Sequence, residues 1–214
     1  MSYDLIIVSQ SKGDLIQVTQ NCIDSARADG AELNIIIVET YQVHEYIGID
    51  ENILYSQEFN YNKCLNLGLS KAKNEIQILA NNDIIFKEGW SKIGDIMKAN
   101  NILSASALSN DIRQRDFSKG DHTYEGYEIG YQLTGWCIFA QKELWSRIGR
   151  LNESYQFWFS DNTYAKQLKQ KGILHYLICS IQVDHIGSRT LITQDRMTQR
   201  RYTFSQGKGI REFR

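Results

Sequence analysis

The triplet Asn81-Asn82-Asp83 follows a largely apolar run, residues 76–80, and places a carboxylate where a strand is expected to end. In open α/β sheets, ligands collect at the carboxyl ends of strands. An aspartate at that edge supplies the hard oxygen ligands that Mg²⁺ and Mn²⁺ prefer. Asn and Asp are also favoured turn residues, so a solvated turn is the competing interpretation.

Two further polar residues mark the ends of expected elements. Asp161 precedes a helical pattern after an aromatic run, residues 157–159, and its simplest role is an N-cap whose carboxylate accepts helix N–H groups. His185 closes the last apolar run and could equally be a hydrogen-bonded strand end, since a lone histidine is weak evidence for a ligand. Each residue is ambiguous by itself, and the elements that carry them must decide whether they meet.

The elements expected to position these residues alternate between buried strands and helices. Continuous apolar strands separated by helices argue for a parallel sheet covered on both faces, with right-handed crossovers. Nucleotide-binding folds have this organisation. Strands are expected at 5–8, 33–38, 76–83, 102–108, 134–140 and 174–183, and helices at 15–26, 61–72, 90–97, 142–148 and 162–171.

The stretch 109–131 has no usable period and is rich in Asp, Arg, Gly and Tyr. A connection of this length inside a compact domain is usually a functional loop or lid. We therefore expect it to border a ligand site rather than to link two domains.

Length and composition indicate one soluble globular domain. The chain has 214 residues, of which 42% are hydrophobic and 23% charged, ordinary values for such a protein. No apolar run approaches the roughly 20 residues of a membrane span. The start at Met1 lacks the features of a signal peptide, so a cytoplasmic location is expected. The cysteines form no Cys-x-x-Cys pair, which favours buried free thiols over a zinc site or disulfides: Cys22, Cys64, Cys137 and Cys179.

The net charge of −1 conceals an asymmetric distribution. Residues 187–214 hold seven basic and two acidic residues, a net charge of +5, which leaves −6 for the rest of the chain. Tyr202, Phe204 and Phe213 interleave with these cations, a combination that suits a polyanionic partner such as nucleic acid or a nucleotide diphosphate. A solvated C-terminal helix or tail is the alternative.

Several short motifs follow one another in a recognisable order: Ser9-Gln10-Ser11, Val38-Glu39, Asn66-Leu67-Gly68, Leu79-Ala80-Asn81-Asn82-Asp83, Thr134-Gly135-Trp136-Cys137-Ile138-Phe139, Ile148-Gly149-Arg150-Leu151-Asn152-Glu153, Phe159-Ser160-Asp161 and His185-Ile186-Gly187-Ser188. Together they resemble GT-A fold glycosyltransferases of the family 2 type, which transfer a sugar from a nucleoside diphosphate to an acceptor hydroxyl. The resemblance covers residues 5–189. It implies an α/β catalytic domain at 1–188, with a Rossmann-like, mostly parallel sheet flanked by helices, and a basic extension at 189–214.

The resemblance implies a role for the three polar residues. Asp83 would bind the divalent metal, Mn²⁺ or Mg²⁺, as the last residue of the family's Asp-x-Asp motif. His185 would complete the metal or diphosphate shell. Asp161 falls on the aspartate of the family's Glu-Asp motif, the general base.

The resemblance also implies contacts to the donor, expected to be a UDP-sugar. Glu39 would face the uracil or ribose, with Ser9 and Ser11 lining the same pocket, and Asn81 would reach the ribose or the metal shell. Trp136 would form a flat wall for the donor sugar or acceptor, although a core aromatic on a strand needs no function. The remaining implied donor contacts are Asn66, Asn82 and Arg189.

Three residues depart from the family pattern. Ser160 replaces the usual glutamate before the base, and Thr163 stands where a second acidic residue is common, which puts the positioning of the acceptor in doubt. Asn81 in place of aspartate makes the metal site less anionic and favours weaker metal binding without the diphosphate.

The chemistry of glycosyl transfer agrees with these assignments. The reaction passes through an oxocarbenium-like centre and needs a carboxylate to take the acceptor proton and cations to hold the departing diphosphate. A single displacement with inversion is expected, because no second carboxylate is evident for a covalent sugar intermediate. The transferred sugar is a hexose or a pentose.

The acceptor remains open between two classes. It is a glycan or small molecule, or a nucleic-acid base that carries a hydroxyl, such as hydroxymethylcytosine, which the basic tail suggests. The charge of −6 on the body would confine any DNA contact to one face. A nucleotide-sugar-binding protein without catalysis is a further alternative. A Rossmann dehydrogenase is disfavoured, because no Gly-x-Gly-x-x-Gly follows the first strand.

Overall fold

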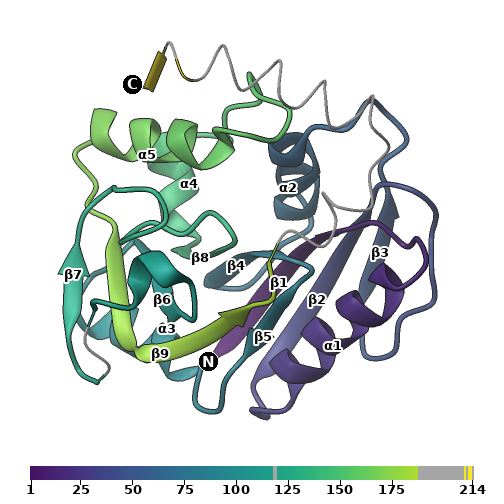
Figure 1. Ribbon diagram of the computed structural model, residues 1–214, viewed down its shortest axis with the longest axis horizontal. Coiled ribbons are helices and arrows are strands. Elements are labelled where there is room, and N and C mark those ends of the chain that lie inside the picture. Colours follow the sequence, from purple (N-terminus) through teal and green to yellow (C-terminus); the bar gives the residue numbers. More distant parts are fainter. Residues whose placement is uncertain (118–119, 188–209, 211, 214) are drawn as a thin grey trace.

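The structure is a computed structural model that describes residues 1–117, 120–187, 210 and 212–213 (Figure 1). Its strands form one sheet, with the order β3-β2-β1-β4-β8-β6-β9-β5 and with β7 paired to β9. Most of the basic extension expected at 189–214 lies outside the described residues. The strands are β1 (Ser2–Ser9), β2 (Glu32–Glu39), β3 (Glu51–Leu54), β4 (Ile76–Asn81), β5 (Ile84–Phe86), β6 (Ser104–Ser109), β7 (Thr123–Glu125), β8 (Cys137–Gln141) and β9 (Tyr176–His185). The helices are α1 (Leu15–Arg27), α2 (Tyr61–Leu69), α3 (Lys92–Ala99), α4 (Glu143–Ile148) and α5 (Ser160–Gln170), with a 3₁₀ turn at Ile112–Gln114.

The first half of the sheet is parallel, as the apolar pattern predicts. β1 pairs in parallel with both β2 and β4. The register places Ser9 beside Glu39 on β2, and Val8 beside Asn81 on β4. The carboxyl ends of three strands therefore meet at one edge of the sheet, where ligands of such folds collect.

The second half of the sheet is mixed rather than parallel. β8 runs antiparallel to β4 and to β6, and β5 runs antiparallel to the end of β9. This last pairing sets Ile84 opposite His185, so the residue before Ile84 comes close to the histidine. The antiparallel pairing thus brings Asp83 and His185 together.

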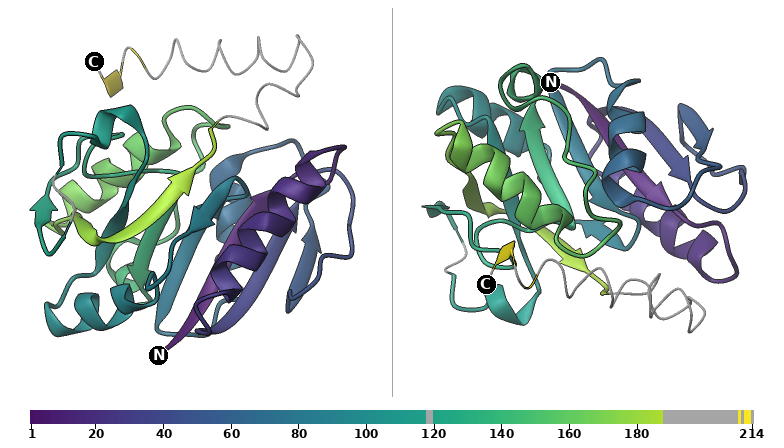
Figure 2. Two further views of the ribbon diagram at one scale, coloured as in Figure 1. Left: turned by 60° about the horizontal axis from the view of Figure 1, so that its bottom comes forward. Right: turned by 90° about the horizontal axis from the view of Figure 1, so that it is seen from above.

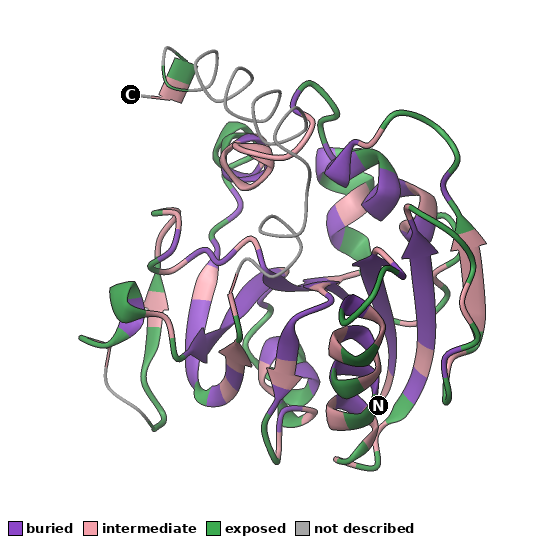
Figure 3. Cartoon of the chain, turned by 45° about the vertical axis from the view of Figure 1, so that its right-hand side comes forward, coloured by how far each residue is buried: buried purple, intermediate pink, exposed green. Residues whose placement is uncertain are grey.

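Helices cover both faces of the sheet (Figure 2). Along β1, Leu5 and Ile7 pack into the cluster that contains α1 and α3. Ile6 and Val8 pack into the cluster that contains α2, α4 and α5, because neighbouring side chains of a strand point to opposite faces. Figure 3 shows β1 and β2 buried over most of their length, while β3 lies at the edge of the sheet.

Helix α2 approaches β1 closely at a glycine. A Cβ on Gly68 would lie 2.3 Å from the Cγ2 of Ile6, so no larger residue fits there without displacing the strand. The Asn66-Leu67-Gly68 motif therefore has a packing reason for its last residue. This close contact sets the distance between α2 and β1.

Besides the mixed strand pairing, the structure departs from the sequence-based prediction in several individual elements. β3 is short and half-exposed, and its weak apolar pattern did not predict it. The stretch 109–131 contains the 3₁₀ turn and β7. α5 begins at Ser160, so Asp161 lies in its first turn and the N-cap interpretation is wrong; the N-cap position belongs to Phe159, at φ 69°.

Two simple expectations can be compared with the structure. All four cysteines are buried and free. Among the residues that the structure describes, none of the helices has the length and apolar character needed to cross a bilayer.

Candidate active site

A cavity of about 340 Å³ opens where β1 and β4 end. Its lining brings together Asp83, Asp161 and His185, the three residues that the sequence placed at the ends of separate elements. Ser9 and Asn81 also contribute to the lining. The parallel half of the sheet supplies the floor, and the antiparallel half supplies the histidine.

Asp83 and His185 form a buried pair with unused polar atoms. The Oδ1 of Asp83 and the Nε2 of His185 are 3.4 Å apart, and neither has a hydrogen-bond partner in the described part of the chain. The backbone holds both residues, since Ile186 N donates to Asp83 O at 3.0 Å and His185 N donates to the Oδ1 of Asn110 at 2.8 Å. Buried polar atoms without partners are costly, which indicates that a ligand completes this pair.

The pair fits a divalent cation. A carboxylate oxygen and an imidazole nitrogen that each coordinate at about 2.0–2.2 Å are separated by roughly 3 Å when they bind adjacent positions of one ion. Within the described ranges, no cluster of three or more His, Cys, Asp or Glu could hold a metal. The described part of the chain would therefore provide two ligands, and a diphosphate and water could supply others, which is the usual arrangement for Mg²⁺ at phosphate sites.

Trp136 forms one wall of this cavity. Its ring stacks on His185 with centroids 4.8 Å apart and an angle of 10° between the planes. Only 7% of the residue is exposed, yet its buried Nε1–H has no partner among the described residues. Trp136 is thus both a packed residue and a cavity wall, and its indole N–H remains available to a ligand.

Asp161 lines the same cavity from the first turn of α5. Its Oδ1 accepts a hydrogen bond from Asn162 N at 2.9 Å, and Gly135 packs directly against its side chain. Burial raises the pKa of Asp161, while the backbone hydrogen bond and the Arg113 guanidinium act in the opposite direction. A carboxylate with a raised pKa is a stronger base than an exposed aspartate, which suits proton abstraction.

Glu39, the acidic residue at the end of β2, stabilises this edge of the sheet through buried hydrogen bonds. Glu39 is fully buried and accepts from Ser11 N at 2.9 Å and from the Tyr46 hydroxyl at 2.8 Å. The hydroxyl of Ser9 lies 2.8 Å from that of Thr19 and 3.2 Å from that of Tyr46. Burial raises the pKa of Tyr46 to about 12, so it stays a neutral donor. Ser9 lines the cavity, whereas Glu39 and Ser11 lie behind its described lining.

The three asparagines that the sequence assigned to donor binding differ in whether they line the cavity. Asn81 accepts from the Tyr61 hydroxyl at 2.7 Å, Asn82 donates to Thr19 Oγ1 at 3.0 Å, and both line the cavity. Asn66 does not: its Nδ2 donates to Leu151 O at 2.9 Å, and its Oδ1 accepts from Leu151 N at 3.0 Å. Asn66 therefore joins α2 to Leu151 and is not part of the described lining of this cavity.

Arg189 lies outside the described residues, so its predicted donor contact has no structural counterpart here.

Sequence reasoning missed two parts of the cavity. Arg113, from the 3₁₀ turn inside the aperiodic stretch, reaches the cavity beside Trp136 and pairs with Asp111. Aromatic residues form a second wall near Asp161: Phe59, Tyr61, Phe157, Trp158 and Phe159. The length and composition of 109–131 signalled a functional loop, but no pattern identified the arginine within it.

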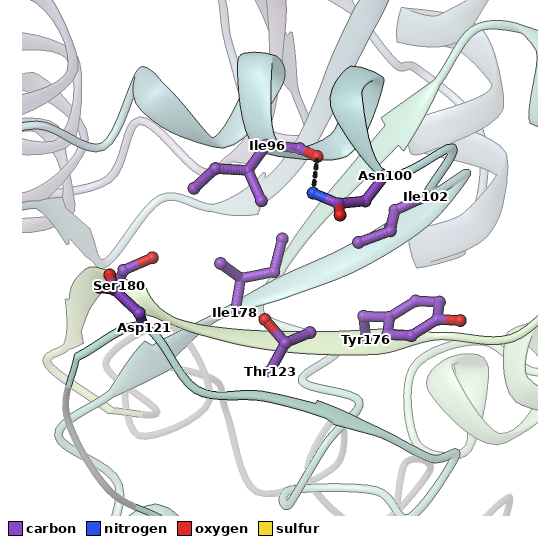
Figure 4. Close-up of a pocket in the computed structure, with 8 residues that line it drawn as sticks. All are labelled: Ile96, Asn100, Ile102, Asp121, Thr123, Tyr176, Ile178 and Ser180. Atoms are coloured by element: carbon purple, nitrogen blue, oxygen red, sulfur yellow. Dashed lines mark hydrogen bonds between the residues drawn. The ribbon is translucent and has the colours of Figure 1, made fainter.

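A second cavity, of about 470 Å³, lies between α3 and the β7–β9 pair (Figure 4). Its floor is apolar, with Ile96, Ile102 and Ile178, and the Asn100 amide donates to Ile96 O at 2.9 Å. Its lining has no buried polar atom without a partner in the described part. Chemistry therefore identifies the cavity with Asp83, Asp161 and His185 as the candidate site.

Of the comparisons with known proteins, only the one with solved structures supports the fold. No family model and no curated protein matches the sequence. Solved structures match with TM-scores of 0.67 for S. aureus TarS, 0.63 for S. aureus TarS 1-349 and 0.63 for GalNAc-T7 with UDP, GalNAc and Mn²⁺. The alignments cover 88%, 85% and 86% of this chain at identities of 11%, 9% and 12%.

The chain spans only part of each matched structure, 37%, 60% and 44% of their lengths in the same order. These neighbours are glycosyltransferases. At such low identities the likeness establishes only a GT-A-like α/β fold. Any activity must be inferred from the residues of the site.

Proposed function

We propose that this chain is a metal-dependent glycosyltransferase that moves a sugar from a nucleoside diphosphate, with UDP as the first choice, to an acceptor hydroxyl. The observation that carries the proposal is the buried Asp83–His185 pair, with its unused Oδ1 and Nε2, in one cavity with Asp161. The GT-A-like fold adds support, and one structural neighbour was crystallised with UDP, GalNAc and Mn²⁺.

Asp83 and His185 would hold Mn²⁺ or Mg²⁺ at the end of β4. The bound ion would neutralise the departing diphosphate. The imidazole of His185 favours Mn²⁺, because nitrogen ligands suit it better than Mg²⁺. Stacking on Trp136 and the hydrogen bond from His185 N to Asn110 keep the ring oriented toward Asp83.

Asp161 would take the proton from the acceptor hydroxyl as that oxygen attacks the sugar. Its raised pKa and its place beside the aromatic wall suit this role. We propose a single displacement with inversion, in which the acceptor approaches from the Asp161 side and the diphosphate leaves from the Asp83 side. The hydroxyl of Thr163, which departs from the family pattern, donates to Ser160 O at 2.7 Å and so stabilises the first turn of α5.

The acceptor is proposed to be a glycan or a small molecule. The aromatic wall near Asp161 offers flat apolar faces, which suit stacking against a sugar ring. A DNA acceptor is suggested by the basic extension, most of which lies outside the described residues, and by the aperiodic stretch 109–131. Residues 1–188 are proposed to form the catalytic domain and residues 189–214 an extension to it.

The direct test is binding and turnover with a panel of nucleoside diphosphates and their sugars. UDP should raise the melting temperature in the presence of Mn²⁺ and much less with a chelator. Release of UDP from a UDP-sugar should require the metal and Asp161. Absence of any nucleoside diphosphate binding, with or without metal, would reject the proposal.

A further inference from the structure

Arg113 is the cation that the structure brings into the candidate site without an assigned role. Its Nε donates to Asp111 Oδ1 at 2.9 Å and its Nη2 donates to Asp111 Oδ2 at 3.0 Å. The guanidinium carbon lies 5.2 Å from the centre of the Trp136 ring. The bidentate pair and the aromatic face together fix the plane of the guanidinium, which limits what it can bind and from which direction.

The third nitrogen of this guanidinium, Nη1, takes no part in the pair with Asp111. Nη1 has no hydrogen-bond partner in the part of the chain that the structure describes. A Cβ at Gly130 would lie 2.4 Å from Nη1, so the absence of a side chain there leaves the room that Arg113 needs. Gly130 has a φ of 84°, which also favours glycine. Loop geometry and packing thus hold a charged donor in place before any ligand binds.

Arg113 lies in the same cavity as the proposed base. Its guanidinium rests on the ring of Trp136, and Gly135, the residue before Trp136, packs against the side chain of Asp161. Arg113 and Asp161 also act on each other electrostatically: Asp161 contributes to the raised pKa of Arg113, and Arg113 opposes the burial that raises the pKa of Asp161. Because the diphosphate is assigned to the ion at Asp83 and His185, we assign Arg113 to the acceptor.

We infer that Nη1 of Arg113 binds an anionic group of the acceptor, a phosphate or a carboxylate close to the attacking hydroxyl. The inference rests on the proposed transferase function and narrows its acceptor to hydroxyl compounds that carry such a group. A planar, pre-oriented guanidinium is the side chain best suited to phosphate and carboxylate oxygens. The anion would also hold the acceptor so that its hydroxyl meets Asp161.

The experiment compares small three-carbon acceptor analogues with and without an anionic group. Protein saturated with UDP and Mg²⁺ is titrated with glycerol 3-phosphate, glycerate or uncharged glycerol, and binding is followed by ligand-observed NMR. Wild type should bind the anionic members at least about tenfold more tightly, the usual effect of a charge-assisted hydrogen bond. Arg113→Gln should bring them to within about twofold of glycerol, whereas Arg113→Lys should keep part of the preference.

Arg115 provides a matched control in the same loop. Its side chain is 70% exposed and pairs with the exposed Asp116 at 3.5 Å. Arg115→Gln removes the same charge two positions away and should leave the anion preference unchanged. Circular dichroism and melting temperatures of the variants check that the fold is intact.

The outcomes separate the alternatives. Equal binding of charged and uncharged analogues, or no binding of the anions at millimolar concentrations, overturns the inference. A tenfold loss of UDP affinity in Arg113→Gln also overturns it, because Arg113 would then contact the donor diphosphate. If wild type binds no UDP, the proposed function fails by itself, and the same titration without nucleotide still tests Arg113.

Discussion

Gly135 lies directly against Asp161. A Cβ at Gly135 would be 2.7 Å from the Cβ of Asp161 and 3.0 Å from its Oδ2. The chain that leads into β8 therefore sets the position of the carboxylate at the start of α5. This contact gives a physical reason for a glycine in the Thr134-Gly135-Trp136 motif, and it leads to the first prediction.

Replacing Gly135 with alanine should displace the Asp161 carboxylate, since a contact of 2.7 Å forces one of the two groups to move. We expect turnover to fall by about 10²-fold, because displacing a catalytic group by about 1 Å can cost that much. UDP affinity should change little. Measurements of kcat, UDP binding and melting temperature separate this effect from unfolding, and full activity in a stable variant would contradict it.

Asp83→Asn should weaken the binding of UDP in Mn²⁺ by at least about tenfold, because an amide oxygen is a much poorer ligand than a carboxylate. Binding measured with a chelator should be unchanged. Asp184→Asn is the matched control: Asp184 is next to His185 but forms an ion pair with Lys87 and is 36% exposed at its side chain. If UDP binding depended equally on Mn²⁺ in wild type and in Asp83→Asn, the assignment of the metal to Asp83 would be wrong.

Asp161→Asn should reduce turnover by about 10²–10⁴-fold while leaving UDP affinity intact, which is the usual contribution of a positioned base. In wild type, kcat should fall as the pH drops through the raised pKa of Asp161, and this fall should begin above the range of an ordinary aspartate. An activity profile that is flat down to pH 4 would contradict the assignment.

The same raised pKa predicts an effect on stability. A carboxyl group with a folded-state pKa above its unfolded value stabilises the fold below the unfolded pKa, and this contribution is lost as the pH rises through the folded pKa. Asp161 is such a group. Asp161→Asn should therefore raise the melting temperature at pH 7, and the difference should disappear in acid. A lower melting temperature at pH 7 would show that the ionised form is stabilised instead.

Asn66→Ala should destabilise the protein without a specific effect on the donor. The change removes the hydrogen bonds that join α2 to Leu151 and Glu153, and it leaves the buried backbone groups of Leu151 unsatisfied. We expect a loss of about 2–3 kcal/mol in the free energy of unfolding. Asn21→Ala on the exposed face of α1 is the control. Normal stability with weakened UDP binding would restore Asn66 as a donor contact.

The basic extension allows a test of a DNA acceptor. If it binds nucleic acid, affinity for duplex DNA should fall steeply between low and moderate salt, because phosphate contacts release counterions. Arg200→Ala with Arg201→Ala should weaken DNA binding across sequences and leave UDP affinity almost unchanged. Both arginines lie outside the described residues. No DNA binding at low salt would exclude this acceptor.

Local sequence patterns were sufficient for the longer, buried elements of the fold. The apolar runs identified β1, β2 and β4, and the helical spacing identified α1 and α2, because burial on both faces leaves a direct trace in residue type. The same patterns placed polar residues at the ends of elements. They did not predict β3, whose half-exposed position leaves only a weak pattern.

The tertiary structure decided which of these ends meet. His185 reaches Asp83 through the antiparallel pairing of β5 with β9, and strand pairing depends on the packing of the whole chain rather than on either segment. Arg113 enters the cavity that contains Asp161 from an aperiodic loop for the same reason. Asn66, in a motif that suggested the donor, instead binds the backbone of Leu151. Residue type and local period thus determine which side chains lie at element ends, and only the packing of distant strands and loops determines which of them share a site.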